Sequence, residues 1–148
     1  MITLDANVLV YAVDAREPLK QRLAIEIIAA AADVPTRLGL QAIGEFFVAS
    51  IRKVGTGVDV AHRRVRYLLD TFEVFTHTGT AVERAAAESA MGRLSYWDAV
   101  LLASAEEAGC MAMLSEDMAD GGKFGALTVH NPFRPGGISD AARTLLQL

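Results

Sequence analysis

Four acidic side chains stand where the chain could bring them together for chemistry. Asp5 follows the apolar run Ile2–Leu4, Asp98 lies in SYWDA, and Asp117 lies in LSEDM. A fourth acid, Glu45, lies within the otherwise apolar stretch QAIGEFF. Converging carboxylates repel, and at ~5 Å and an effective dielectric of ~20 each ionised pair costs about 3 kcal/mol. A cluster of three or four must therefore take up protons or bind a cation.

Carboxylate oxygens of this kind select magnesium or manganese over zinc. No softer site competes, because Cys110 has no Cys or His neighbour at zinc spacing and is expected to be buried apolar filler. A bound magnesium or manganese ion activates water and neutralises a phosphodiester under attack, so the chemistry suggested is phosphodiester hydrolysis. We expect no protein nucleophile, since Ser115 lacks a neighbouring histidine as base and His62, His77 and His130 are scattered.

Each aspartate also has a purely structural interpretation. Asp5 could N-cap the helix that follows it. Asp98 lies three residues after the serine of SYWDA, so the pair resembles a capping box in which the acid reaches back to the helix-start amide. Asp117 could be an ordinary turn former, with Glu116 and Asp120 as acidic neighbours able to take its place. The local sequence leaves these alternatives open.

Glu45 has a structural alternative of a different kind. On a helical projection it lies opposite Ile43 and Phe47 and close to Gln41 and Arg52. Periodicity alone therefore predicts that Glu45 lies on a solvated helix face. The hypothesis of a metal site depends on all four acids meeting, and no single one of them establishes it.

Strand-like and helix-like segments alternate along the chain, which predicts a parallel sheet with helices packed on it. The expected strands are Ile2–Leu4, Arg37–Leu40, Glu73–Thr76, Met111–Leu114 and Leu127–Asn131. The expected helices are one just after Asp5, then Glu17–Asp33, Gln41–Lys53, Val58–Phe72, Val82–Met91, Ser95–Gly109, and a short tail helix capped by Ser139. Asp5 would then lie at the carboxyl end of a strand, the edge where ligands collect in such sheets. The polar, glycine-rich stretch SEDMADGGKFGA is expected to be a loop.

Length and composition indicate one domain over residues 1–148, with residues 134–148 as a C-terminal tail. Apolar residues make up 52% of the chain, which is enough for a well-filled core. No apolar run approaches the ~20 residues of a membrane span. The N-terminus also lacks the basic and then apolar pattern of a signal peptide. We therefore expect a cytoplasmic protein that does not associate with membranes.

The net charge of −4 argues against a protein that holds nucleic acid by bulk positive charge, but it leaves room for a local basic patch beside a metal site. The densest basic region comprises Arg52, Lys53, Arg63, Arg64 and Arg66. Such a region is mostly a solvated face. The alternative is that it guides an RNA backbone past the acids.

Four segments of the chain carry a family resemblance. DANVLVYAVD, QAIGEFF, SYWDAVLLASAEEAG and LSEDMADGGKFGALTVHNPF resemble the four acidic motifs of PIN domains, in particular those of VapC-type toxins of bacterial toxin–antitoxin pairs. The resemblance spans residues 2–133, and the last motif is its most specific part. It implies a three-layer α/β/α fold with a central parallel sheet of four to five strands. It also implies a metal-dependent endoribonuclease.

The resemblance further implies which residues form the site. Asp5, Glu45, Asp98 and Asp117 would be the catalytic, metal-site acids, with Asn7 and Ser115 as polar supports beside the cofactor. One or two Mg²⁺ or Mn²⁺ ions would be held by Asp5 and Asp98, with Glu45 and Asp117 acting directly or through bound water. Cleavage would leave a 3′-hydroxyl and a 5′-phosphate. The implied partners are an RNA substrate, a small antitoxin protein and a second copy of the chain in a homodimer.

Other classes of protein fit the sequence less well. A haloacid dehalogenase-type phosphotransferase would carry a second aspartate where this chain has Asn7. A non-catalytic receiver domain would carry an acidic pair after the first strand. A PIN nuclease outside toxin–antitoxin systems stays open as an alternative. A PIN scaffold that only binds a partner is a further alternative, but the four intact acids argue against it. Trp97, Phe46 and Phe47 could line an antitoxin surface, although aromatic residues at such spacings are more typical of a core.

Overall fold

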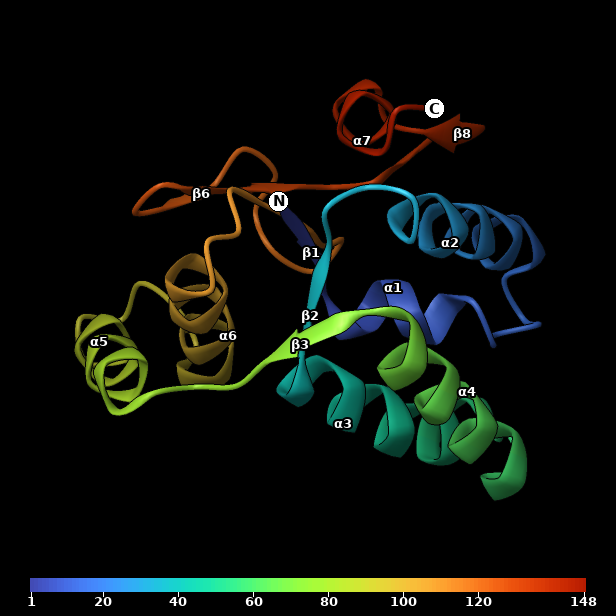
Figure 1. Ribbon diagram of the computed structural model, residues 1–148, viewed down its shortest axis with the longest axis horizontal. Helices are drawn as coiled ribbons and strands as arrows, with labels where there is room; N and C mark the ends of the chain where they lie inside the picture. The colour runs from blue at the N-terminus through green and yellow to red at the C-terminus, as the bar shows by residue number, and fades with distance from the viewer.

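The computed structural model describes all residues, 1–148, as short strands with helices around them (Figure 1). The strands are β1 Ile2–Leu4, β2 Arg37–Gly39, β3 Glu73–Phe75, β4 Ala112–Leu114, β5 Lys123–Phe124, β6 Leu127–His130, β7 Phe133–Arg134 and β8 Gly137–Ile138. The helices are α1 Ala6–Tyr11, α2 Pro18–Ala31, α3 Leu40–Ala49, α4 Val58–Thr71, α5 Gly79–Ala90, α6 Tyr96–Glu107 and α7 Asp140–Leu146. A π-helical turn, Ser50–Val54, follows α3 directly.

The central sheet has four strands in the order β1-β4-β6-β5. Strand β4 pairs in parallel with β1 and with β6, and β5 pairs antiparallel with β6 at the edge. Strands β2 and β3 form a separate parallel pair, which joins β1 through a bridge between Ile2 and Thr36. The predicted α/β fold with a mostly parallel sheet is therefore confirmed, and the antiparallel β5 is the one departure from a purely parallel arrangement.

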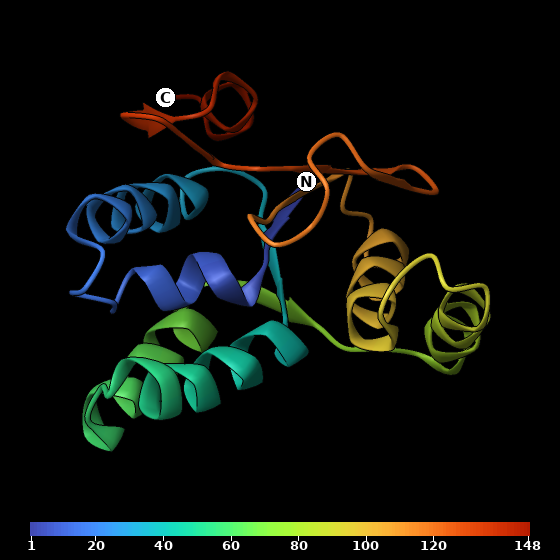
Figure 2. The same cartoon turned by 180° about the vertical axis from the view of Figure 1, so that it is seen from behind.

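Successive side chains along a strand point to opposite faces of the sheet, and this alternation explains the arrangement of the sheet between two layers of helices. Leu4 and Leu114 are fully buried in the larger hydrophobic cluster, whereas their neighbour Met113 is buried in the second cluster on the opposite face. Since both faces of β4 are apolar, the sheet requires helices on both sides. Helices α1 to α4 lie on one side and α5 and α6 on the other, as both views show (Figures 1 and 2).

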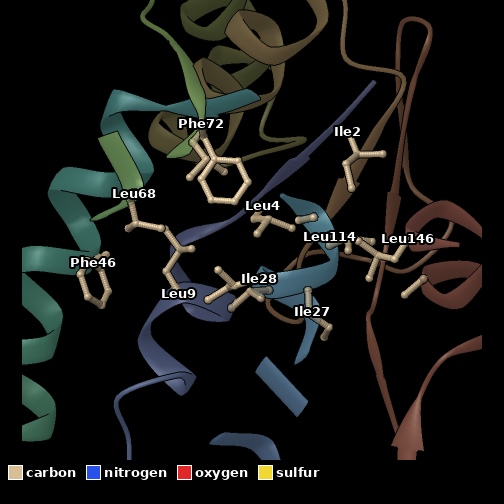
Figure 3. Close-up of a cluster of buried hydrophobic side chains, with 14 of the residues drawn as sticks. Ile2, Leu4, Leu9, Ile27, Ile28, Phe46, Leu68, Phe72, Leu114 and Leu146 are labelled. Carbon is tan, nitrogen blue, oxygen red and sulfur yellow. The ribbon is translucent and has the colours of Figure 1, made fainter. Parts of the chain in front are cut away.

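The larger cluster ties the helices α1, α2, α3 and α4 to the sheet (Figure 3). Leu9 of α1, Ile27 of α2, Phe46 of α3 and Leu68 of α4 are buried in this one cluster together with Leu4 of β1 and Leu114 of β4. Phe46 is 2% exposed, so the expectation that it belongs to the core is confirmed. Through this cluster the core fixes the positions of α1 and α3, which carry residues of the candidate site.

Several boundaries differ from the sequence-based expectation. The stretch SEDMADGGKFGA is not all loop, because Lys123–Phe124 pairs with β6 through a turn at Gly125. Gly125 has φ +56°, and any side chain there would collide with the carboxylate of Glu106. The expected helix over 41–53 is α3 followed by the π-helical turn, and α5 begins earlier than expected because Thr78 caps it.

The C-terminal residues pack on the rest of the chain. The β7–β8 hairpin leads into α7, where the hydroxyl of Ser139 accepts a hydrogen bond from the Ala142 amide, as the sequence predicts. Ile138, Ala142 and Leu146 are buried in the larger cluster. Cys110 is also buried, as expected, and burial raises the pKa of its thiol to about 11. None of the helices is both long and apolar enough to cross a membrane.

Candidate active site

All four acids singled out from the sequence line one cavity of about 730 Å³. Asp5 comes directly after β1, Glu45 lies on α3, Asp98 lies in the first turn of α6, and Asp117 follows β4. Helices α1, α3 and α6 begin at the same side of the sheet, near the carboxyl ends of the parallel strands (Figure 1). Asn7 lines the cavity as well, whereas Ser115 is fully buried behind it. The edge predicted to collect ligands does gather these side chains.

Asp5 is held in place by hydrogen bonds to both carboxylate oxygens. The amide of Ala6 donates to Oδ1 at 2.7 Å, which makes Asp5 the N-cap of α1. The Ser115 hydroxyl donates to Oδ2 at 2.6 Å, and Nδ2 of Asn7 donates to the same oxygen at 2.8 Å. A carboxylate oxygen can accept about two hydrogen bonds, so Oδ1 retains one acceptor position. The capping interpretation of Asp5 and its place in the cavity are therefore compatible.

The support around Asp5 is itself fixed by the backbone. The Asp5 amide donates to the carbonyl of Leu114 at 3.0 Å, so the carboxylate leaves β1 in register with β4. The Glu116 amide donates to Oδ1 of Asn7 at 3.3 Å, which turns the Asn7 amino group toward Asp5. Asn7 and Ser115 therefore both donate hydrogen bonds to the Asp5 carboxylate, and their role beside a cofactor stays a prediction.

Burial is the main reason that the pKa of Asp5 is raised above its ordinary value of 3.8. Repulsion by the carboxylates of Glu45 and Asp117 raises the pKa further, while the hydrogen bonds from Ser115 and Ala6 lower it. An ionised Asp5 is therefore costly in this cavity unless a cation compensates for its charge. In the absence of a cation, its contribution to stability is present below pH 3.8 and is lost as the pH rises through the folded-state pKa.

Glu45 is exposed, as its helical periodicity predicts, and the surface that it faces is the cavity. Gln41, one turn earlier on α3, donates from Nε2 to Glu45 Oε1 at 2.8 Å and to the carbonyl of Trp97 at 3.1 Å. One side-chain amide therefore links the helix that carries Glu45 to the start of the helix that carries Asp98. The sequence places Gln41 close to Glu45 on the helix, but we predicted no role for Gln41, although its i, i+4 spacing from Glu45 is a signal that could have indicated one.

Only one of the two hydrogen bonds of the expected capping box forms between Ser95 and Asp98. The Ser95 hydroxyl accepts a hydrogen bond from the Asp98 amide at 3.2 Å, but the Asp98 carboxylate makes no return bond to the Ser95 amide. The carboxylate is exposed and lines the cavity. Trp97 beside it is 60% exposed, so the expectation of a core position fails for this residue.

Neither Glu116 nor Asp120 takes the place of Asp117 in the cavity. Glu116 accepts a hydrogen bond from Lys20 Nζ at 2.6 Å and does not line the cavity. Asp120 accepts one from the Asn131 amide at 2.9 Å and so stabilises the loop. Of the three neighbouring acids, only Asp117 lines the cavity.

The donor set suits a hard cation that keeps part of its water shell. No three His, Cys, Asp or Glu side chains lie close enough together to form a complete metal site. The four acids instead surround an open cavity from different elements, and every candidate ligand among them is an oxygen atom. Mg²⁺ is usually held by one or two carboxylates with several waters retained, so these residues fit such an ion.

Comparison with known proteins identifies the family. A family model described as PIN domain matches residues 2–119, which is well over half of the chain. The chain therefore belongs to the PIN domain family, and the resemblance noted in the sequence is confirmed. No curated protein matches it.

Solved structures share the fold at low sequence identity. VapC20 of Mycobacterium tuberculosis, described as a toxin that cleaves the sarcin–ricin loop, is 18% identical, with a TM-score of 0.58 over 76% of this chain and 87% of its own. FitAcB from Neisseria gonorrhoeae is 20% identical, with a TM-score of 0.62 over 89% and 98% of the two chains. VapBC2 from Rickettsia felis, bound to a promoter DNA fragment, is 13% identical, with a TM-score of 0.59 over 88% and 98%. At these identities the likeness shows the fold alone.

The raised pKa of Asp5 can be measured by carboxyl-detected NMR titration of the metal-free protein. We expect the Asp5 carboxyl to titrate with a midpoint above 3.8, and the signal to be absent from an Asp5→Asn variant. Asp14 serves as the internal control, because its hydrogen bond from Arg16 lowers the pKa of its carboxyl below 3.8. A midpoint for Asp5 at or below that of Asp14 would show that burial and repulsion do not dominate at this site.

Proposed function

We propose that this protein is a Mg²⁺- or Mn²⁺-dependent endoribonuclease and acts as the toxin of a toxin–antitoxin pair. The observation that carries the proposal is the convergence of Asp5, Glu45, Asp98 and Asp117 on one cavity at the carboxyl edge of β1 and β4. Membership of the PIN domain family supports it. So does the likeness to VapC20, whose description is that of a toxin cleaving the sarcin–ricin loop.

In the proposed mechanism, the four acids would hold one or two divalent ions. Bound ions of this kind lower the pKa of a coordinated water and neutralise charge on a phosphodiester under in-line attack. Asn7 and Ser115 keep the Asp5 carboxylate in one orientation, through bonds of 2.8 and 2.6 Å to Oδ2. Gln41 holds Glu45 against the start of α6. We propose that cleavage leaves a 3′-hydroxyl and a 5′-phosphate, as the family resemblance implies.

The chain's own side chains do not supply a nucleophile in this proposal. The Ser115 hydroxyl is fully buried and already donates to Asp5. None of the three histidines lines the cavity, so no imidazole is available there to activate a hydroxyl. Water is therefore the attacking group that the cavity can accommodate.

The proposed partners are a small antitoxin protein and a second copy of the chain. Two structural relatives, FitAB and VapBC2, are described as bound to DNA, the former to an IR36 fragment and the latter to a fragment of its promoter. We propose that this chain is inhibited by a small antitoxin protein and forms a homodimer. A short reading frame beside the gene whose product copurifies with the chain and suppresses cleavage supports this role, and its absence favours a nuclease with another cellular task.

Replacing the central acids should abolish cleavage. We expect Asp5→Asn and Asp98→Asn to cut a fluorescent single-stranded oligoribonucleotide at least about 100-fold more slowly in Mg²⁺, because each removes a charged oxygen ligand. EDTA should abolish cleavage by the parent, and added Mg²⁺ should restore it. Mg²⁺ should also raise the thermal unfolding midpoint of the parent more than that of either variant, since an ion that binds the folded state stabilises it.

Asp70→Asn is the matched control, because Asp70 lies on α4, outside the cavity, and makes no side-chain hydrogen bond or ion pair. It should cut and melt like the parent. If Asp5→Asn and Asp98→Asn cut as fast as Asp70→Asn, the metal-nuclease proposal is wrong. A parent that cuts only a DNA oligonucleotide of the same sequence would contradict RNA as the substrate.

Gln41→Ala should slow cleavage by about 10- to 100-fold through kcat, because misplacing a catalytic group by ~1 Å costs on this order. KM should change little, since Gln41 positions Glu45 and is not proposed to contact RNA. Gln21→Ala on α2, away from the cavity, is the control. An unchanged kcat for Gln41→Ala would remove its positioning role.

A further inference from the structure

The cavity that the four acids line also has basic residues in its lining. Arg52 and Lys53, both on the π-helical turn Ser50–Val54, line the cavity together with the four acids. Both side chains are exposed, and neither takes part in a salt bridge or a side-chain hydrogen bond. Their charges are therefore available to a ligand that enters the cavity.

The backbone of this turn is tightly specified. The carbonyl of Ser50 accepts hydrogen bonds from the amides of Gly55 and Thr56, the latter at 2.9 Å. Gly55 adopts φ +78°, a left-handed conformation that glycine tolerates best. The Ser50 hydroxyl is buried and donates to the carbonyl of Phe47 at 3.0 Å. π-Helical turns are rare and frequently occur at functional sites.

A second contact clamps the turn to the chain after α1. The Arg16 guanidinium binds both carboxylate oxygens of Asp14, at 2.8 and 2.7 Å, and donates from Nη1 to the carbonyl of Lys53 at 2.9 Å. Asp14 is 5% exposed, so the carboxylate that binds Arg16 is buried and held in place by the surrounding protein. The pairing neutralises Arg16, which also lines the cavity, and leaves Arg52 and Lys53 as its unpaired cations.

The cations of α4 have a different position. Arg63, Arg64 and Arg66 do not line the acidic cavity, and Arg64 instead borders an apolar cavity beside Tyr67 and Leu68. The five basic residues that form one dense region in the sequence are thus divided by the fold into two groups, and only Arg52 and Lys53 share a cavity with the acids.

We infer that Arg52 and Lys53 bind backbone phosphates of single-stranded RNA next to the phosphate that is cleaved, an inference that rests on the proposed ribonuclease function. A polyanion is repelled by four carboxylates, so productive binding requires cations on the same cavity. The π-helical turn, fixed by Ser50 and by the Asp14–Arg16 pair, presents two such cations on the segment that continues the Glu45 helix. The α4 arginines contribute only to the general surface charge.

The test compares two double variants that each remove two positive charges. Arg52→Ala/Lys53→Ala should raise KM for a single-stranded oligoribonucleotide by about tenfold or more, with kcat within about threefold of the parent. The slope of log affinity against log salt should fall by about 1.4, since each phosphate contact on a single strand contributes about 0.7. Arg63→Ala/Arg66→Ala should leave KM and the slope close to the parent values.

A charge-conserving variant separates charge from folding. Arg52→Lys/Lys53→Arg should keep the parental salt slope. Arg52→Gln/Lys53→Gln should show the same reduced salt slope as Arg52→Ala/Lys53→Ala, while its thermal unfolding midpoint stays at the parental value. If the parent neither binds nor cuts RNA, the proposed function itself fails. If the parent cuts RNA but Arg52→Ala/Lys53→Ala keeps the parental KM and salt slope, the inference is overturned and the proposed function stands. The same holds if Arg63→Ala/Arg66→Ala raises KM and lowers the salt slope as much as Arg52→Ala/Lys53→Ala does.

Discussion

The arrangement depends on one buried carboxylate. Asp5 leaves the end of β1 with three hydrogen bonds, from Ala6, Asn7 and Ser115, and with repulsion from two further acids. The hydrogen bonds fix where the carboxylate points, while burial and repulsion make its charge costly. The Asp5 carboxylate therefore has a fixed orientation, but the protein compensates its charge only in part. A divalent cation is the ligand that such a group binds best, because it removes the repulsion at its source.

The rest of the fold can be understood as support for that carboxylate. Strand β4 lies between β1 and β6, so the sheet sets Ser115 beside Asp5 through the bond from the Asp5 amide to Leu114. Packing of α3 against the core through Phe46 brings Glu45 to the same cavity, and Gln41 couples α3 to the start of α6. The π-helical turn after α3 then adds two positive charges, Arg52 and Lys53, to the lining of the same cavity. One cavity therefore combines acids that suit a metal with cations that suit phosphates.

Much of this arrangement follows from the sequence, for identifiable reasons. Apolar runs that end in acids locate Asp5 and Asp117, because strand ends are local features. Periodicity correctly predicts that Glu45 is exposed, but it cannot say that the exposed face looks into a cavity, since that depends on where α6 lies. The same limit applies to the basic residues, because Arg52 and Arg63 lie only eleven positions apart in the sequence, yet the fold places Arg52 at the cavity and Arg63 away from it. Strand β5 escaped detection because two residues carry no periodicity, and their pairing with β6 is a tertiary effect.

We propose that the Asp5 carboxylate and its acidic neighbours hold a divalent cation. Crystals grown without metal and soaked in MnCl₂ test this directly by anomalous scattering at the manganese edge. We expect an anomalous peak inside the cavity, within about 2–2.5 Å of an Asp5 carboxylate oxygen, and no such peak in crystals of Asp5→Asn soaked in the same way. A cavity free of manganese in the parent, or an ion of equal occupancy in the Asp5→Asn crystals, would contradict it.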